Sequence, residues 1–142
     1  MAEANSDSIF TKIIKGEIPC QRVFENEHVL AFLDITPLSP GHTLVVPKRQ
    51  VASMEDLPEA DAAALAAALV RLAPRVRDAT EAEGYNVLLN DGKAAGQEVP
   101  HVHFHIIPRR AGDGLGYRWK AQPAERQTLA ELARKIVTAL QP

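Results

Sequence analysis

Cysteine is nearly absent from this 142-residue chain, in which Cys20 is the only one. A single thiol forms no disulfide within the chain and cannot supply a four-cysteine zinc cluster. No apolar run is long enough to span a bilayer, and residues 1–8 lack the apolar core of a secretory signal. These absences predict a cytoplasmic protein with no membrane partner.

Charge of one sign is not in excess either. The chain has 16 lysines and arginines against 18 aspartates and glutamates, which gives a net charge of −2. Without a basic surplus, a protein does not attract nucleic acid non-specifically. We therefore expect no nucleic-acid partner, and an anionic ligand would have to be held by a local site.

The spacing of apolar residues predicts three helices. The first covers residues 6–15, with Ser6 as its N-cap, and the longest covers residues 59–83 and ends at Gly84. A capping-box pattern over residues 128–131 predicts the start of a C-terminal helix.

Apolar and alternating segments predict five strands, over residues 22–25, 28–33, 42–47, 85–89 and 100–108. Hairpins followed by a long helix and further strands favour an α+β fold around an antiparallel sheet. Residues 109–127, which include Tyr117 and Trp119, are predicted to be irregular. We expect one domain over residues 1–142, with its core over residues 8–110 and an extension over residues 111–142.

The most unusual stretch is Pro-His-Val-His-Phe-His-Ile-Ile-Pro, at residues 100–108. Side chains two residues apart on a strand share a face, so His101, His103 and His105 are predicted to line one face. Their apolar neighbours would then be buried on the other face. Three imidazoles on one face are useful only beside a cleft, so we expect the active site here.

Three interpretations of the histidine row remain open from the residues alone. Imidazole is neutral near pH 7 and can attack phosphorus, while a neighbouring imidazolium supplies charge and a proton. His-x-His on a strand is also a recurring zinc arrangement, with His42 or Cys20 as a possible further ligand. The third interpretation is an edge strand whose histidines have no function.

The polar loop before the histidines favours an anion site. Gly92 and Gly96 allow backbone N–H groups to converge on an anion, and Gln97 can form hydrogen bonds without adding charge. The loop by itself is equally consistent with an ordinary hairpin connection.

Four segments together resemble the histidine triad (HIT) family of nucleotide hydrolases and transferases. They are residues 8–14 (SIFTKII), 31–37 (AFLDITP), 41–48 (GHTLVVPK) and 96–107 (GQEVPHVHFHII). They follow the family's order, and the last is the most specific. The chain is most similar to the Hint branch and its bacterial relatives, which implies a HIT-like fold and an AMP-type purine nucleotide ligand.

The resemblance implies a catalytic set of four histidines and one glutamine. His103 would attack the α-phosphorus of a nucleotide and form a nucleotidyl-histidine that water then cleaves. His105 would contact the non-bridging phosphate oxygens, while His101 and His42 would orient the site and relay protons. Gln97 lies where the family contacts the leaving group.

The resemblance also implies a nucleotide-binding set. Asp34 matches the acidic residue that accepts both ribose hydroxyls, although a turn aspartate would look the same in sequence. Asn90 matches a polar residue near the ribose and phosphate, and Gly96, Glu98 and Val99 adjoin it in the loop. The pocket around the base would be formed by Ile9, Phe10, Ile13, Phe32, Leu33, Ile35 and Leu44.

Two positions depart from the family pattern. Some relatives carry a Cys-x-x-Cys that completes a zinc site, but here Ser8 and Thr11 offer weakly ligating hydroxyls. We therefore expect neither a bound metal nor a cofactor. Glu98 replaces a serine of phosphoramidate-cleaving Hint proteins. Its carboxylate would repel phosphate unless it points away or pairs with a cation such as Arg109, or it could receive a cationic amine leaving group.

The sequence thus predicts a purine-nucleotide hydrolase that cleaves nucleoside phosphoramidates or related nucleoside monophosphate conjugates. A diadenosine polyphosphate hydrolase and a nucleotide-binding regulatory protein with little catalysis are the alternatives. The family also implies a homodimer. The alanine-rich run at residues 60–68 would permit close contact between two long helices, although it is equally explained by helix propensity.

Overall fold

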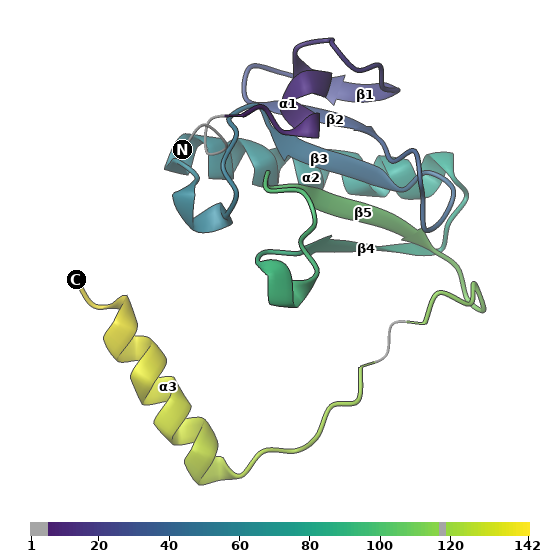
Figure 1. Cartoon of the computed structure of the whole chain (residues 1–142). Coiled ribbons are helices and arrows are strands. Elements are labelled where there is room, and N and C mark those ends of the chain that lie inside the picture. The colour runs from purple at the N-terminus through teal and green to yellow at the C-terminus, as the bar shows by residue number, and fades with distance from the viewer. Residues whose placement is uncertain (1–5, 117–118) are drawn as a thin grey trace.

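The computed structural model describes residues 6–116 and 119–142, and within these ranges five antiparallel strands form one sheet (Figure 1). Tyr117 lies outside the described residues. The strands follow the order β1-β2-β3-β5-β4 across the sheet. Their bounds are Arg22–Glu25 (β1), Val29–Leu33 (β2), Thr43–Pro47 (β3), Gly84–Leu89 (β4) and Phe104–Arg109 (β5). The predicted α+β fold with an antiparallel five-stranded sheet is confirmed.

Helices lie on both faces of this sheet. The α-helices are α1 (Ile9–Ile14), α2 (Glu59–Ala79) and α3 (Arg126–Leu140), and two short 3-10 helices cover Met54–Asp56 (η2) and Lys93–Ala95 (η3). The long helix α2 packs against one face, and the short helix α1 lies over the other (Figure 1). The sheet is therefore the middle layer of the domain.

Each face of the sheet has its own apolar core. Alternate side chains of a strand point to opposite faces, so Val29 and Ala31 of β2 pack against Leu65 of α2. Leu30 and Phe32 of the same strand pack against α1 on the other side. Because both faces are covered, β2 is apolar along its whole length.

The register of β5 sets the face on which the histidines lie. His105 pairs with Leu44 of β3 and Leu88 of β4. Its neighbours Phe104 and Ile106 pack into the core below α2. The His105 side chain therefore lies on the α1 face, opposite the long helix.

The predicted histidine strand begins later than expected. Residues 100–108 were predicted to be extended, whereas β5 starts at Phe104. The Val102 N–H donates to the Val51 carbonyl (2.8 Å), and the His101 N–H donates to the Val99 carbonyl (2.8 Å). These bonds replace ladder bonds to β3, so residues 100–103 form an irregular lead-in to the strand.

The helix ends also differ from the prediction. The N-cap of α1 is Ser8 and not Ser6, because the Ser8 side chain accepts the Thr11 N–H. Helix α2 ends at Ala79, since the Thr80 hydroxyl donates to the Val76 carbonyl (2.8 Å) and Glu81 turns the chain at a φ of 56°. Gly84, predicted to cap this helix, is the first residue of β4.

The C-terminal segment stands apart from the sheet in Figure 1. Helix α3 begins at Arg126, so Thr128 lies inside it and the predicted capping box is wrong; Glu125 is the N-cap and makes no side-chain cap. All side chains of α3 are exposed. In the described part of the chain, no helix combines the length and apolar character needed to cross a membrane.

Candidate active site

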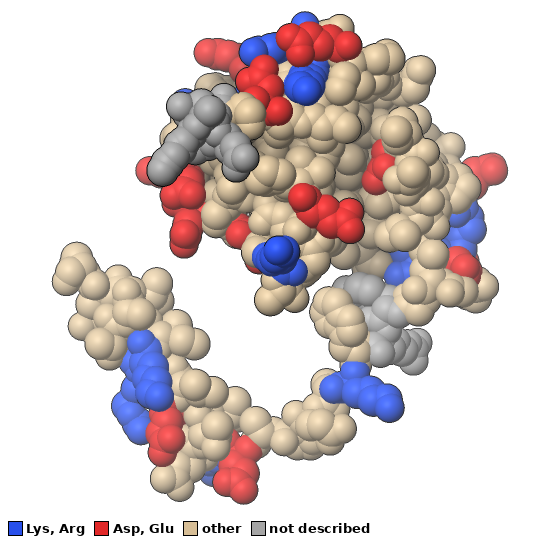
Figure 2. Space-filling view, in the orientation of Figure 1, with Lys and Arg blue, Asp and Glu red and all other residues tan. Residues whose placement is uncertain are grey.

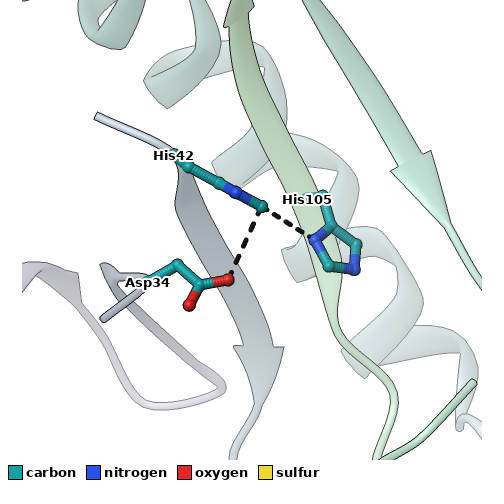
Figure 3. Close-up of side chains that lie close together, drawn as sticks. All are labelled: Asp34, His42 and His105. Carbon is teal, nitrogen blue, oxygen red and sulfur yellow. Dashed lines mark hydrogen bonds and ion pairs between the residues drawn. The ribbon is translucent and has the colours of Figure 1, made fainter. Parts of the chain in front are cut away.

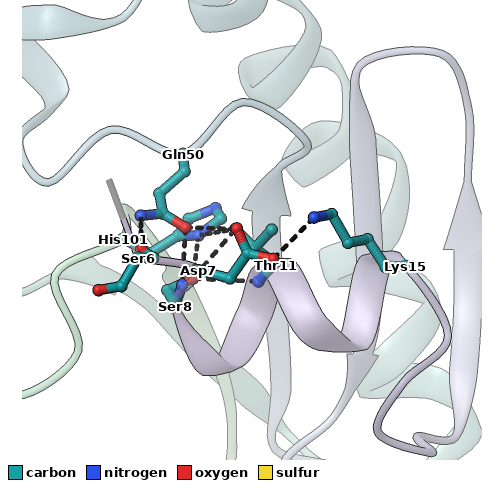
Figure 4. A network of polar contacts seen from close by, with 7 residues as sticks. All are labelled: Ser6, Asp7, Ser8, Thr11, Lys15, Gln50 and His101. Carbon is teal, nitrogen blue, oxygen red and sulfur yellow. Dashed lines mark hydrogen bonds and ion pairs between the residues drawn. The ribbon is translucent and has the colours of Figure 1, made fainter. Parts of the chain in front are cut away.

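His101 is a fully buried histidine with both ring nitrogens bound. Its Nε2 lies 2.8 Å from the Pro47 carbonyl oxygen, and because a carbonyl only accepts, this nitrogen carries the proton. Nδ1 is then an acceptor, and the Ser8 hydroxyl donates to it at 2.7 Å (Figure 4). His101 thus connects the start of α1 to the end of β3.

His103 has the opposite tautomer. Its Nδ1 lies 2.8 Å from the His101 carbonyl oxygen, so Nδ1 carries the proton and Nε2 holds the lone pair. Within the described residues, this Nε2 has no hydrogen-bond partner. Phe10 packs edge-on against the ring, with centroids 4.8 Å apart. The structure therefore presents His103 as a fixed imidazole with a free, unprotonated nitrogen.

His42 and His105 form a second pair on the same face (Figure 3). The Leu38 N–H donates to Nδ1 of His42 (3.1 Å), so the His42 proton resides on Nε2. That nitrogen donates to Nδ1 of His105 at 2.9 Å, which leaves the His105 proton on its own Nε2. Nε2 of His105 is buried and has no partner in the described chain.

A buried donor without a partner is uncommon, because losing its hydrogen bonds to water costs about 1–3 kcal/mol. The His105 ring lies beside that of His103, with centroids 5.0 Å apart. The site thus sets a lone pair next to an unmet N–H donor. An electrophilic atom that carries an oxyanion would suit both groups, because His103 would attack the atom and the oxyanion would accept the His105 N–H.

Burial favours the neutral form of three histidines in this region, His42, His101 and His105. Burial, and then the neighbouring rings of His103 and His42, lowers the pKa of His105 to about 4. Burial also lowers the pKa of His42, which the Asp34 carboxylate partly opposes. The pKa of His101 is lowered by burial as well. These three rings are therefore uncharged at neutral pH.

Asp34 lies at the border between the histidines and an apolar cavity. One carboxylate oxygen lies 3.8 Å from Nε2 of His42 (Figure 3). The other accepts the Thr36 N–H at 2.9 Å, as in an Asx turn. The turn role and a ligand role are compatible, because the oxygen facing His42 keeps acceptor capacity.

The cavity beside Asp34 has a volume of about 110 Å³ and an almost entirely apolar lining. Such a lining suits a flat aromatic group better than a charged one. All seven residues of the expected base pocket lie along it: Ile9, Phe10, Ile13, Phe32, Leu33, Ile35 and Leu44. The structure adds Ile18, Pro19 and Cys20, which no motif marked, because only the turn after α1 brings them to this face.

The loop that precedes the histidines is tied together by Gln97. Its side-chain oxygen accepts the Gly92 N–H (2.8 Å), and its nitrogen donates to the Ala52 carbonyl (2.7 Å) and the Val99 carbonyl (3.1 Å). Both amide hydrogens of Gln97 are thus used within the protein, whereas its oxygen accepts one bond and keeps a second lone pair. Gln97 could therefore accept a hydrogen bond from a leaving group, but it could donate one only by giving up a bond to Ala52 or Val99.

Three other predicted residues, Asn90, Val99 and Gly96, have different positions around this loop. Asn90 follows the last pair of the β4–β5 ladder, Leu89 with Phe104, so the register places it beside His103. Val99 packs against the core below α1. Gly96 is left-handed, with a φ of 96°, which favours glycine there.

Glu98 is exposed, and of the alternatives open for it, a pairing with Arg109 is not found among the described residues. Arg109 donates instead to Asp113 (2.7 Å) and to the Asn86 side chain (2.7 Å). The carboxylate of Glu98 is therefore free to face solvent or an incoming molecule.

The family model of the HIT domain matches residues 15–112 of this chain. The chain belongs to the HIT family. A Schizosaccharomyces pombe protein named adenosine 5'-monophosphoramidase hnt1 is 43% identical over 129 residues, which cover 90% of this chain and 94% of that protein. The crystal structure of a HIT family member from Bacillus subtilis superposes with a TM-score of 0.90 at 38% identity and covers 96% of this chain and 99% of that one.

A zinc-bound histidine triad protein from Mycobacterium smegmatis is also similar, with a TM-score of 0.72 and 39% identity over 93% of this chain and 94% of that one. The two positions at which some relatives have the cysteines of a zinc site carry other residue types in this chain. Ser8 and Thr11 offer neutral hydroxyls where zinc favours thiolates and imidazoles. The unprotonated nitrogen of His101, Nδ1, already accepts a hydrogen bond from the Ser8 hydroxyl. This set does not fit the metal.

The donor atoms of Asp34, His42 and His105 also converge, within 4.8 Å of one another. Nε2 of His42 carries the proton that it donates to His105, because the Leu38 N–H occupies the other nitrogen. To ligate a cation through Nε2, His42 would have to move its proton to Nδ1, where the Leu38 N–H already points. The hydrogen bonding of this cluster therefore also opposes metal coordination.

Proposed function

We propose that this HIT protein hydrolyses nucleoside phosphoramidates and related nucleoside monophosphate conjugates, with an AMP-type purine nucleotide as its ligand. The observation that carries the proposal is the pairing of a free Nε2 lone pair on His103 with the unpartnered Nε2–H of His105. Substitution at phosphorus needs a nucleophile on one side and a hydrogen-bond donor to the phosphate oxygens on another.

The reaction divides into two displacements. Nε2 of His103 attacks the α-phosphorus, the bond from phosphorus to the leaving nitrogen breaks, and the amine departs with an added proton. Water then attacks the same phosphorus, the bond from phosphorus to His103 breaks, and the nucleoside monophosphate is released. The Nδ1–H of His103, bonded to the His101 carbonyl, stabilises the positive charge on the ring while it carries the nucleotide.

The leaving amine requires a proton donor, and the ligand itself can create one. His42 and His105 are neutral in the free protein because their surroundings disfavour charge. A phosphate anion beside Nε2 of His105 raises the pKa of that ring, since an opposite charge stabilises the imidazolium. The pair His42–His105 can then take up an additional proton when substrate is bound, with loss of the hydrogen bond between the two rings, and this would supply a general acid.

The apolar cavity and Asp34 support a nucleoside as the bound group. The cavity would accept the base, and Asp34 would accept the ribose hydroxyls between the base and the histidines. The similarity to the S. pombe adenosine 5'-monophosphoramidase supports adenosine as the nucleoside and an amine as the leaving group.

A test of this function is the turnover of adenosine 5'-phosphoramidate by wild-type protein and by His103→Ala. We expect wild-type turnover and a loss of at least about 10⁴-fold in the variant, because the nucleophile is gone. His28→Ala serves as the control, since His28 contacts Asp61 and Glu27 and no residue of the site. Near-normal turnover by His103→Ala would contradict the role of His103.

We also propose that the protein is a homodimer. β4 is an edge strand of the described sheet, and two of its residues, Tyr85 and Val87, are 37% and 41% exposed. An unpaired edge with apolar side chains is a template for pairing with a second copy. Sedimentation velocity at micromolar concentration should give twice the mass of one chain. A monomer under these conditions would overturn this proposal.

A further inference from the structure

We propose that Ser8, Thr11 and Gln50 form a positioning cluster that fixes the tautomer of His101 and, through its carbonyl, the orientation of His103. The catalytic part of this inference rests on the proposed function. The structural part concerns hydrogen bonds alone and can be tested separately. None of the three residues touches the apolar cavity or the His42–His105 pair.

The orientation of Gln50 is the starting point of the cluster (Figure 4). Its side-chain nitrogen donates to the Ser6 carbonyl at 2.8 Å, and this fixes which end of the amide is which. The oxygen of the same amide then accepts the Ser8 N–H (2.7 Å) and the Thr11 hydroxyl (2.5 Å). Gln50 thereby holds the first turn of α1 from outside the helix.

The position of each proton follows from these contacts. The Thr11 hydroxyl proton is used on Gln50, and the Ser8 oxygen accepts the Thr11 N–H at 3.0 Å. The Ser8 hydroxyl proton can then go to Nδ1 of His101, at 2.7 Å. The Nε2–H of His101 is used on the Pro47 carbonyl. One consistent arrangement of protons therefore satisfies every polar atom around the buried ring.

The consequence for the nucleophile comes through the backbone of residue 101. A ring held from both sides fixes the peptide that carries it, and the carbonyl of that peptide accepts the Nδ1–H of His103 at 2.8 Å. That bond is what leaves the lone pair of His103 on Nε2. If His101 changes its tautomer or rotates, the carbonyl shifts and the attacking nitrogen is misplaced. A misplacement of about 1 Å can reduce a rate on the order of 100-fold.

Ser8 also caps α1, so a test has to separate the cap from the donated proton. Ser8→Ala removes both, whereas Ser8→Asp keeps an acceptor for the Thr11 N–H but donates no proton to His101. Ser8→Thr keeps both and serves as the rescue variant. Asp7→Asn is the control, because Asp7, which precedes α1, pairs at the surface with Lys15 at the other end of the helix (2.7 Å).

The first measurement is nitrogen NMR of the histidine side chains in wild type, Ser8→Asp and Ser8→Thr. We expect His101 protonated at Nε2 and His103 protonated at Nδ1 in wild type and Ser8→Thr. In Ser8→Asp, His101 should carry a proton on Nδ1. A wild-type His101 protonated at Nδ1, or the same tautomer in all three proteins, would overturn the proposal whatever the activity of the enzyme.

The second measurement is the kinetics of phosphoramidate cleavage by the same proteins. We expect kcat to fall by about 10- to 100-fold in Ser8→Ala and Ser8→Asp, with AMP affinity unchanged because the cavity is intact. Ser8→Thr and Asp7→Asn should keep kcat within about 2-fold of wild type. Unchanged kcat in Ser8→Asp beside an altered His101 tautomer would overturn the coupling to His103. Absent turnover in wild type would instead contradict the proposed function and leave the NMR test decisive.

Discussion

His101 and His105 lie only four residues apart in the sequence, yet their rings have opposite surroundings. His101 is fully buried, and both its nitrogens are bound within the protein. His105 is partly buried, and its Nε2–H has no partner in the described chain. Buried polar groups are normally satisfied, so the unmet one marks where a ligand supplies the missing partner. Burial of a histidine alone therefore does not identify a contact with substrate.

The two faces of the sheet show the same contrast on a larger scale. Below α2, apolar side chains such as Val45 and Leu65 fill the core. Below α1, the apolar core ends in a cavity bordered by Asp34 and next to the histidines. On the face shown in Figure 2, charged side chains form small groups of both signs rather than one extended field. The ligand would therefore be selected by local contacts.

The largest effect in this comparison is expected from replacing His105, because its N–H donor is unpartnered in the described chain whereas that of His101 is bound. His105→Asn keeps an acceptor for the Nε2–H of His42 but removes the unpartnered donor. We expect kcat for adenosine 5'-phosphoramidate to fall by about 10²- to 10³-fold, the usual loss for one oxyanion donor. The free energy of unfolding should change by less than about 1 kcal/mol, because the lost group had no partner in the folded protein.

Steady-state kinetics and urea unfolding measure these two quantities. A matched His28→Asn variant should leave kcat unchanged, since His28 lies outside the site. If His105→Asn instead lost stability while retaining kcat, His105 would be a structural histidine like His101.

A smaller effect is expected at the border of the cavity. Asp34→Asn keeps the acceptor for the Thr36 N–H but removes the carboxylate charge that would bind the ribose hydroxyls. We expect the Kd for AMP to rise by about 10-fold or more, because hydrogen bonds to charged groups contribute about 1.5–3 kcal/mol. Isothermal titration calorimetry measures this change.

The matched ligand control is 2'-deoxy-AMP. Its affinity should fall less than that of AMP when Asp34 is replaced by Asn, because it keeps only one of the two hydroxyls that would donate to the carboxylate. An equal loss of affinity for both nucleotides would mean that Asp34 acts through the histidines and not by binding the ribose hydroxyls.

The smallest effect concerns stability and pH. His42, His101 and His105 have lowered pKa values in the folded protein, so between pH 6.5 and about 4 the unfolded chain binds more protons. The free energy of unfolding should therefore decrease as the pH falls through this window. His105, which faces His103, His42 and Asp34, contributes about 1 kcal/mol of this loss at pH 5.5, after allowance for solvent screening.

Urea unfolding at pH 7.5 and pH 5.5 tests the sign, and His105→Asn should lose less stability over the same interval. Carboxylates with lowered pKa values, such as Asp113, lose their stabilising contribution at lower pH and do not account for this window. Equal stability at both pH values would contradict the neutral state of the buried histidines.

The sequence was informative where one period or one motif decides the structure. Alternation predicted strands such as Arg22–Glu25, which the structure has with the same bounds, and the histidine motif predicted the family. The start of β5 was not predictable, because the Val102 N–H bonds to Val51 in a distant segment. Gln50 was missed for the same reason, since its partner Thr11 lies 39 residues away in sequence. Contacts of this kind arise only when separate segments meet.

The most direct test of the account is mass spectrometry of wild-type protein quenched with alkali during turnover of adenosine 5'-phosphoramidate, because acid hydrolyses the bond between phosphorus and imidazole. The account predicts one adenylyl group per chain, mapped by fragmentation to His103 and absent from a His103→Ala control. An adduct on His101 or His105, or turnover that proceeds with no adduct at any quench time, would contradict it.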